Sequence, residues 1–116
     1  MTINSPTSGA VTDGAETEEP LEQRLAQLLR ERGEKDPEVR RLLNSWEDEQ
    51  ERLVEASADY HLAQIELNLR RGRLYFAAGY KEDARANFES ARTQAWNEGR
   101  EELFRSIMEE MDKLGL

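Results

Sequence analysis

The chain has 116 residues, carries a formal net charge of −9 and contains no cysteine. This length suffices for one domain with a modest core, and the missing cysteine excludes disulfide bonds, thiolate zinc sites and a cysteine nucleophile. The negative charge repels phosphate backbones and anionic lipids, so we expect neither a nucleic acid nor a membrane as a partner. A soluble, cytoplasmic protein is the expectation.

The chain begins with an acidic segment, residues 1–19, which is rich in Thr, Ser, Gly, Asp and Glu. Because few large apolar side chains occur there, burial cannot repay the entropy of ordering, and we predict a disordered acidic tail. The same region has no Lys, no Arg and no apolar run typical of a signal peptide. No stretch approaches the roughly 18 apolar residues of a membrane span. We assign residues 20–116 to a single helical domain.

Two amphipathic helices are predicted at the start of this domain, over residues 20–32 and 37–56. In the first helix the apolar positions share one face, formed by Leu21, Leu25, Leu28 and Leu29. Asp36 and Pro37 mark the start of the second helix, because an Asp side chain caps backbone N–H groups and proline suits the first helical turn. The apolar stripe of this second helix includes Trp46, which we interpret as a core residue.

The sequence leaves the end of the second helix open. Residues 38–77 contain no proline and a single glycine, so one helix of about 60 Å is compatible with the pattern. Helices of that length are rare, and the segment 56–59 consists of small and polar residues. We therefore favour a break there, with Ser57 or Asp59 capping a third helix over residues 59–78.

The helices over residues 59–78 and 81–97 are predicted to form an antiparallel hairpin around a turn at Gly79. On the first helix one stripe carries Leu62, Ile65, Leu69, Gly72 and Phe76. On the second helix the apolar positions are spaced four, three and four residues apart, at Ala84, Phe88, Ala91 and Ala95. Small residues beside one large ring let two helices approach closely, which favours the hairpin.

Six residues in this hairpin, over roughly residues 65–98, resemble the tetratricopeptide signature. In that signature a glycine and an aromatic residue precede a turn, and an alanine, aromatic, alanine series follows. The matching residues are Gly72, Tyr75, Gly79, Ala84, Phe88 and Ala91. The chain departs from the pattern at Asn68 and Arg71, which replace the usual tryptophan and leucine, and at Trp96, which replaces proline.

The resemblance implies a scaffold that holds other proteins. It places four residues along a face that commonly lines a peptide groove: Glu66, Leu69, Arg73 and Phe76. Arg70 and Arg71 complete a basic cluster with Arg73. For these two, pairing with nearby carboxylates or simple solvation of the helix is better supported than ligand binding. For Trp96 two interpretations stay open, namely packing on the last helix and contact with a partner.

A fifth helix is predicted over residues 99–114, before Gly115. Its wide apolar face carries Leu103, Phe104, Ile107, Met108, Met111 and Leu114. It is either a closing helix or the first half of another repeat. Because repeat arrays generally need about three units for stability, the N-terminal helices must cap the hairpin, or two copies must pair, or a partner must complete the core. Homodimerisation is the hypothesis we prefer.

Catalytic residues are not recognisable in the sequence. His61 has no carboxylate three or four residues away on its helix, where a paired base or a metal site would need one. The turn at Gly79 is followed by Lys81 but lacks the glycine-rich loop that binds phosphate. We expect no catalytic residue, no metal site and no cofactor, and therefore no enzyme.

Three functions from different classes are compatible with these features. We favour a protein-binding adaptor or small chaperone-like protein that holds a peptide or helix of a partner. The alternative is a structural subunit that self-associates through its helices. The third is an acidic mimic of nucleic acid, although the Arg residues interspersed among the carboxylates count against it. None of the three calls for a small-molecule substrate.

Overall fold

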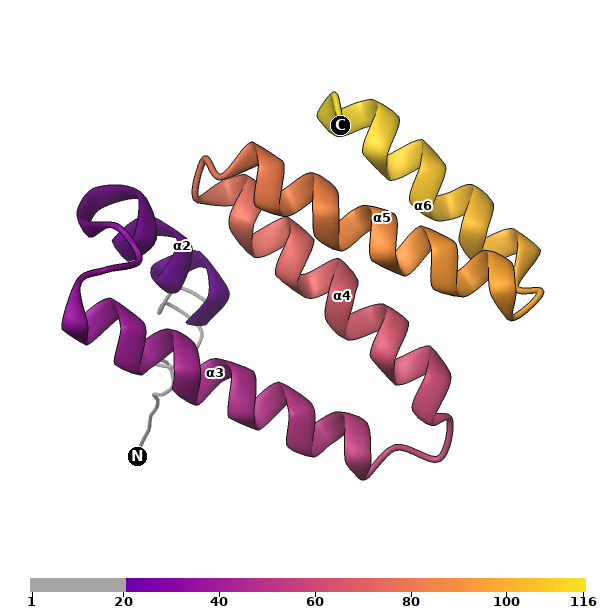
Figure 1. Cartoon of the computed structure of the whole chain (residues 1–116), viewed down its shortest axis with the longest axis horizontal. Coiled ribbons are helices and arrows are strands. Elements are labelled where there is room, and N and C mark those ends of the chain that lie inside the picture. Colours follow the sequence, from indigo (N-terminus) through magenta and orange to yellow (C-terminus); the bar gives the residue numbers. More distant parts are fainter. Residues whose placement is uncertain (1–20) are drawn as a thin grey trace, which may run out of the picture.

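The computed structural model describes residues 21–116, which form five α-helices and no strand (Figure 1). The helices are α2 (Leu21–Arg32), α3 (Pro37–Glu55), α4 (Tyr60–Ala77), α5 (Lys81–Asn97) and α6 (Glu101–Leu114). The all-α class is confirmed, and each helix begins and ends within two residues of its expected range. The tail predicted for residues 1–19 lies outside the described residues.

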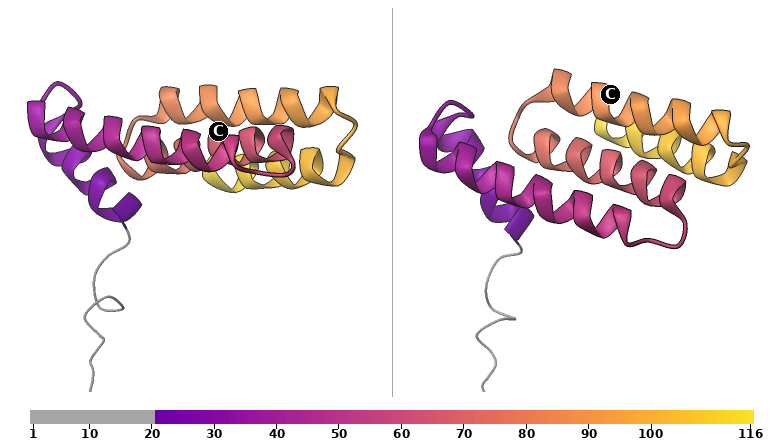
Figure 2. Two further views of the ribbon diagram at one scale, coloured as in Figure 1. Left: turned by 90° about the horizontal axis from the view of Figure 1, so that it is seen from below. Right: turned by 60° about the horizontal axis from the view of Figure 1, so that its bottom comes forward.

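Successive helices run antiparallel and pack side by side, an arrangement compatible with a helical repeat. The closest association is that of α4 with α5, and α3 lies along α4 on one side of this hairpin. On the other side α6 lies along α5, while α2 packs against α3 and α4 at the end where α3 begins (Figure 2). As a result, α4 is the central helix of the bundle.

The start of α3 follows from its first residues. The Asp36 side chain accepts hydrogen bonds from the backbone N–H groups of Glu38 (3.0 Å) and Val39 (3.1 Å), and Pro37 occupies the first turn. Two of the N–H groups that an α-helix leaves unpaired at its start are thereby satisfied. The predicted capping role of Asp36 is confirmed.

The long stretch from residue 37 to residue 77 is two helices, not one. Asp59 caps α4 through a hydrogen bond from the Leu62 N–H (3.1 Å), and the Ser57 hydroxyl accepts one from the Asp59 N–H (3.2 Å). The two candidate residues thus act in series, with Ser57 holding the backbone of the capping residue. This turn reverses the chain so that α4 packs on α3.

The turn after α4 depends on Gly79, which has a positive φ of 89°. The Tyr80 N–H donates to the Tyr75 carbonyl (2.8 Å) and the Gly79 N–H to the Phe76 carbonyl (3.0 Å). This pair of bonds closes a helix when the residue after its end is left-handed, a conformation that glycine adopts without steric cost. The same geometry recurs at Gly99, after α5.

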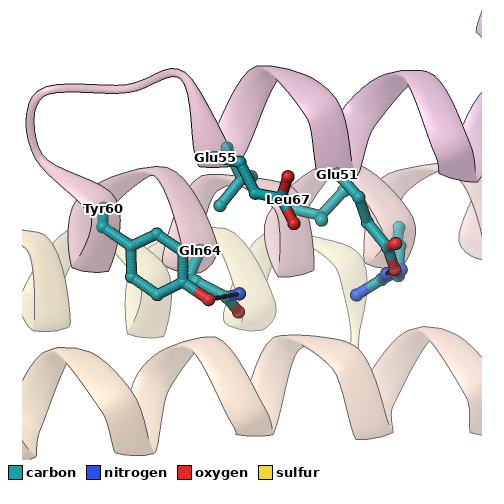
Figure 3. A pocket seen from close by; sticks show the side chains of 7 residues that line it. Glu51, Glu55, Tyr60, Gln64 and Leu67 are labelled. Carbon is teal, nitrogen blue, oxygen red and sulfur yellow. Dashed lines mark hydrogen bonds and ion pairs between the residues drawn. The ribbon is translucent and has the colours of Figure 1, made fainter.

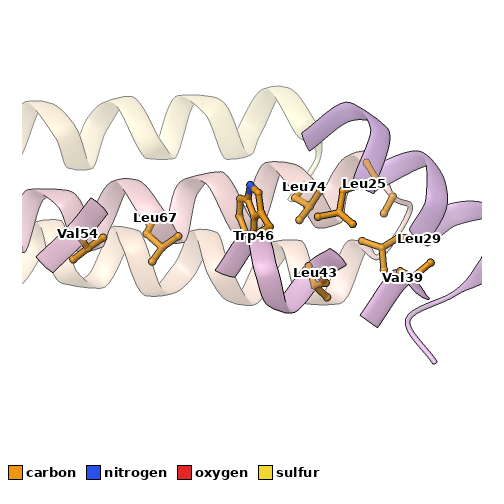
Figure 4. Close-up of a cluster of buried hydrophobic side chains, with 10 residues drawn as sticks. Leu25, Leu29, Val39, Leu43, Trp46, Val54, Leu67 and Leu74 are labelled. Atoms are coloured by element: carbon orange, nitrogen blue, oxygen red, sulfur yellow. The ribbon is translucent and has the colours of Figure 1, made fainter. Parts of the chain in front are cut away.

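One hydrophobic cluster lies between α2, α3 and α4 (Figure 4). Its largest members are Leu25, Leu29, Val39, Leu43, Trp46, Val54, Leu67 and Leu74. Trp46 is only 2% exposed, and its indole Nε1 donates to the Glu22 carboxylate (3.2 Å). The interpretation of Trp46 as a core residue is confirmed, and its polar edge has a partner, as buried indoles usually require.

A second hydrophobic cluster lies between α4, α5 and α6. Its buried members are Ile65, Leu69, Phe88, Ala91, Ala95, Ile107 and Met111. Because α4 supplies Leu67 and Leu74 to the first cluster and Ile65 and Leu69 to the second, its apolar surface is buried on two sides. This explains why α4 shows a less clean amphipathic stripe than α3 or α6.

α4 and α5 are in close contact at Gly72. A Cβ atom added to Gly72 would lie 2.6 Å from Cδ2 of Phe88, whose side chain is completely buried. Ala84 and Ala91, one turn to either side of Phe88, are also completely buried. The Phe88 ring of α5 therefore packs directly on the backbone of α4 at Gly72, where no side chain intervenes.

Candidate partner-binding surfaces

A groove runs between α4 and α6, with a volume of about 310 Å³. It is lined by Glu66, Leu69, Arg70 and Arg73 of α4 and by Leu103, Ser106, Ile107 and Glu110 of α6. Apolar side chains form its floor: Leu69 and Ile107 are buried there, and the half-buried Leu103 is the most exposed of the three. Charged side chains occupy the rims. We call this feature the α4–α6 groove.

An ion pair spans this groove. Arg73 donates from Nε and Nη2 to the two carboxylate oxygens of Glu110, each at 2.8 Å. This bidentate geometry is the strongest form of an Arg–carboxylate contact, and the hydrogen bonds to Glu110 raise the pKa of Arg73 above its ordinary value. Because about half of the Arg73 side chain is exposed, the pair stabilises the fold by less than about 1 kcal/mol. Its charged groups stay partly accessible to solvent.

Arg71, unlike Arg73, is directed towards α3. Its Nη2 lies 2.7 Å from a Glu47 oxygen and its Nε lies 2.9 Å from the same atom, with both side chains about three-quarters buried. Arg70 donates from Nη1 to the side-chain oxygen of the buried Gln50 (2.9 Å). The two arginines therefore tie α4 to α3. Arg71 pairs with a carboxylate, as the sequence favoured, whereas Arg70 binds an amide oxygen instead.

The structure separates the five residues that the sequence singled out for partner binding. Glu66, Leu69 and Arg73 line the α4–α6 groove together. Phe76 is half-buried nearly one turn beyond Arg73 and is not among the lining residues. Trp96 lies on α5, is 63% exposed, and contacts the ring of Phe104 of α6 in a tilted arrangement, with 5.0 Å between ring centroids. The contact with Phe104 agrees with the first interpretation of Trp96, packing on the last helix, whereas contact with a partner stays a prediction.

Sequence reasoning missed the wall of the groove that α6 supplies. Ser106 and Glu110 are exposed or half-exposed, and nothing in the sequence pointed to either as a groove residue. Leu103 and Ile107 were assigned to packing alone. Residues 103, 106, 107 and 110 are spaced by three, one and three positions, so they share one face of a helix. This spacing indicates a groove wall only once α6 is known to lie beside α4.

A second hollow lies between the end of α3 and the start of α4, with a volume of about 390 Å³ (Figure 3). It is lined by Glu51, Val54 and Glu55 of α3 and by Tyr60, Gln64, Leu67 and Arg71 of α4. The amide of Gln64 donates to the Tyr60 hydroxyl (3.1 Å), and the buried Val54 and Leu67 form an apolar base. These lining residues include no Ser, Thr or His that could act as a nucleophile or base with the carboxylates.

A charged cluster joins the start of α4 to the turn between α5 and α6. Arg100 contacts both oxygens of Asp59 (3.1 Å), and Nδ1 of His61 lies 3.1 Å from the Glu98 carboxylate. The backbone hydrogen bond from Leu62 and the hydrogen bonds from Arg100 lower the pKa of Asp59 below its usual value. His61 therefore has a carboxylate neighbour after all, supplied by a distant segment, but its side chain is 67% exposed at the surface.

Within residues 21–116, no group of three or more His, Cys, Asp or Glu side chains is arranged to hold a metal ion. In the same part of the chain, none of the helices combines the length and the apolar composition needed to cross a membrane. Comparison of the chain with models of known protein families, with curated proteins and with solved structures gives no significant match. Functional inference for this chain therefore depends on its own surfaces.

Proposed function

We propose that this chain is a non-catalytic protein-interaction module that holds a segment of a partner protein in the α4–α6 groove. The observation that carries the proposal is the composition of the groove, in which an apolar floor of Leu69, Leu103 and Ile107 lies between charged rims. Protein-binding grooves combine these two features, because apolar anchors supply affinity while rim charges select and orient the partner.

The resemblance of the α4–α5 hairpin to a tetratricopeptide unit supports the same function. In this interpretation Gly72 and Phe88 form the close contact of the unit, α2 and α3 form a preceding hairpin, and α6 supplies the second wall of the groove. The contacts of α2 with α3 and α4, and of α6 with α5, are those expected of stacked helical pairs. Stacking leaves the α4–α6 groove as a concave surface.

The rims of the groove define the partner. Arg73 and Glu110 neutralise each other, while Glu66 forms no ion pair within residues 21–116. We expect a partner segment with apolar side chains at its centre and both acidic and basic groups at its edges. Its acidic group would replace Glu110 as the partner of Arg73, and its basic group would replace Arg73 as the partner of Glu110. Such an exchange costs little, because the pair is partly exposed to water.

The proposal is tested by blocking the groove without disturbing the core. Ser106 is exposed and lines the groove, so Ser106→Arg fills it, whereas Ser45→Arg places the same side chain on an exposed position of α3. Partners captured from cells by the tagged full chain and identified by mass spectrometry are compared across the three proteins. We expect a partner retained by the wild type and Ser45→Arg and lost with Ser106→Arg. Equal capture by all three, or recovery of the chain itself alone, contradicts the proposal.

A further inference from the structure

A patch of exposed apolar side chains lies where the second half of α5 meets α6. Trp96 is 63% exposed and Met108 is 38% exposed, and the ring of the half-buried Phe104 is tilted by 54° against that of Trp96. A hollow of about 300 Å³ opens beside the two rings, lined by Arg92, Thr93, Trp96 and Phe104. We call Arg92, Thr93, Trp96, Phe104 and Met108 the Trp96 patch. It shares no residue with the lining of the α4–α6 groove.

The core does not need Trp96. On α5 the positions that face α4 and α6 are filled by Phe88, Ala91 and Ala95, all completely buried. Trp96 adds only the contact with Phe104 and leaves most of its surface in water. Exposing so large an apolar side chain carries a solubility cost, and tryptophan is the residue most enriched among the anchors of protein interfaces.

The charge of the patch is positive, against the balance of the whole chain. The guanidinium of Arg92 lies with its Nη1 3.8 Å from Sδ of Met108. Within residues 21–116 Arg92 forms no ion pair, whereas Arg71, Arg73 and Arg100 each hold a carboxylate. Arg92 thus lacks an ion pair there although the chain has 25 acidic and only 16 basic residues. A thioether sulfur is a weak acceptor, so the Arg92 guanidinium remains available for an external carboxylate.

The surface of α5 next to the patch permits a close approach. Thr93 also lines an adjoining shallow depression, whose other members are Ala86, Glu89, Ser90, Gln94 and Asn97. Four of these six side chains are short or small, so a segment lying along α5 can come near to the helix backbone before it reaches Trp96. Thr93 lines both the depression and the hollow, so the two lie next to each other.

We propose that the Trp96 patch binds an acidic segment of another protein, which places a large apolar side chain against Trp96 and Phe104 and a carboxylate on Arg92. Charge complementarity decides the class of partner, because the patch offers a guanidinium and no carboxylate of its own. The same fact disfavours a second copy of this chain. Two identical patches related by a two-fold axis would each offer a guanidinium, and none of the five patch residues would supply a carboxylate to the other copy.

Selection of peptides tests this site directly. A random peptide library displayed on phage is panned against the full-length chain, and the recovered peptides are synthesised for affinity measurements. We expect peptides in which a large apolar residue lies next to, or one helical turn from, an Asp or Glu. Their affinity falls about tenfold or more with Trp96→Ala and with Arg92→Glu. It is unchanged with Arg41→Glu, which alters an exposed arginine of α3.

Two further measurements keep the result interpretable. Replacing the acidic residue of a selected peptide by Lys restores its affinity for Arg92→Glu, which a general loss of folding cannot produce. Thr93→Glu, at an exposed position, obstructs the hollow and also weakens binding.

The proposal is overturned if no recovered peptide depends on both Arg92 and Trp96, or if the peptides lack acidic residues. Light scattering that shows a dimer dissolved by Trp96→Ala overturns it as well, since the patch is then covered by a second copy.

Discussion

At the scale of single residues, the contact between Gly72 and Phe88 sets how closely α4 and α5 can lie. A glycine inside a helix costs about 1 kcal/mol relative to alanine, so its presence needs a reason. The reason is steric, because the Phe88 ring occupies the space that a side chain at position 72 would require. The ring cannot swing away, since it is completely buried among the alanines of its own helix.

Gly72→Ala is therefore expected to destabilise the protein by about 1–3 kcal/mol, the usual cost of overpacking, although helix propensity alone predicts the opposite sign. Urea unfolding followed by circular dichroism measures this loss. Ser106→Ala, at an exposed helix position, serves as the control and changes the free energy of unfolding by less than about 0.5 kcal/mol. The double variant with Phe88→Leu should lose less free energy of unfolding than the sum of the losses in the two single variants. Full additivity would argue against the clash.

At the scale of helices, Asp59 links two elements that are far apart in the chain. Its carboxylate caps α4 through Leu62 and also binds Arg100 in the turn between α5 and α6. Both interactions favour the ionised form, and the pKa of Asp59 is lowered in the folded protein. The stabilisation is then complete above the pKa of the unfolded chain and is lost as the pH falls through the lower pKa of the folded state.

Asp59→Asn should consequently reduce stability at neutral pH and have a diminishing effect in acid. The free energies of unfolding of the wild type and the variant converge as the pH falls below about 3.9, the ordinary pKa of an Asp side chain. Denaturant titrations at a series of pH values provide the comparison. Asp48→Asn, which removes a carboxylate from an exposed position of α3, should show no such convergence. A gap between wild type and Asp59→Asn that stays constant in acid would contradict the linkage.

At the scale of the whole molecule, α4 joins the two hydrophobic clusters into one body. It is the only helix of residues 21–116 that contributes buried side chains to both. Trp46 reports on the first cluster and Ile107 belongs to the second. Because the loss of either cluster would expose one side of α4, we expect the described helices to unfold in a single cooperative step.

This cooperativity predicts a remote effect of Ile107→Ala. Removing a completely packed Ile side chain costs about 2–5 kcal/mol, and the loss should appear in the unfolding of the distant first cluster. The measurement is Trp46 fluorescence during urea unfolding, made in a Trp96→Phe background so that one indole reports. A Trp46 transition that does not move, while helical circular dichroism is lost earlier, would mean that the α5–α6 side unfolds separately.

The sequence by itself determined the order and approximate extent of the helices, but it favoured rather than determined the division of residues 37–78 into two. These depend on interactions within about four residues, such as the Asp36 cap, the Gly79 turn and the spacing of Ala84, Phe88 and Ala91, and such local rules can be applied without knowing the fold. The break before Tyr60 was the weakest of these predictions, because several small polar residues could have ended α3 there.

Only the tertiary structure decided which surfaces face each other and which stay open. The direction of α6 beside α4 creates the groove, brings Glu110 to Arg73, and leaves the outer face of Trp96 in water. Periodicity identifies an apolar face but not the helix that covers it. For α4 the choice was doubly open, because side chains such as Leu67 and Leu69 lie on different sides and are both buried. Long-range packing, rather than local propensity, therefore determines which surfaces of this protein stay open.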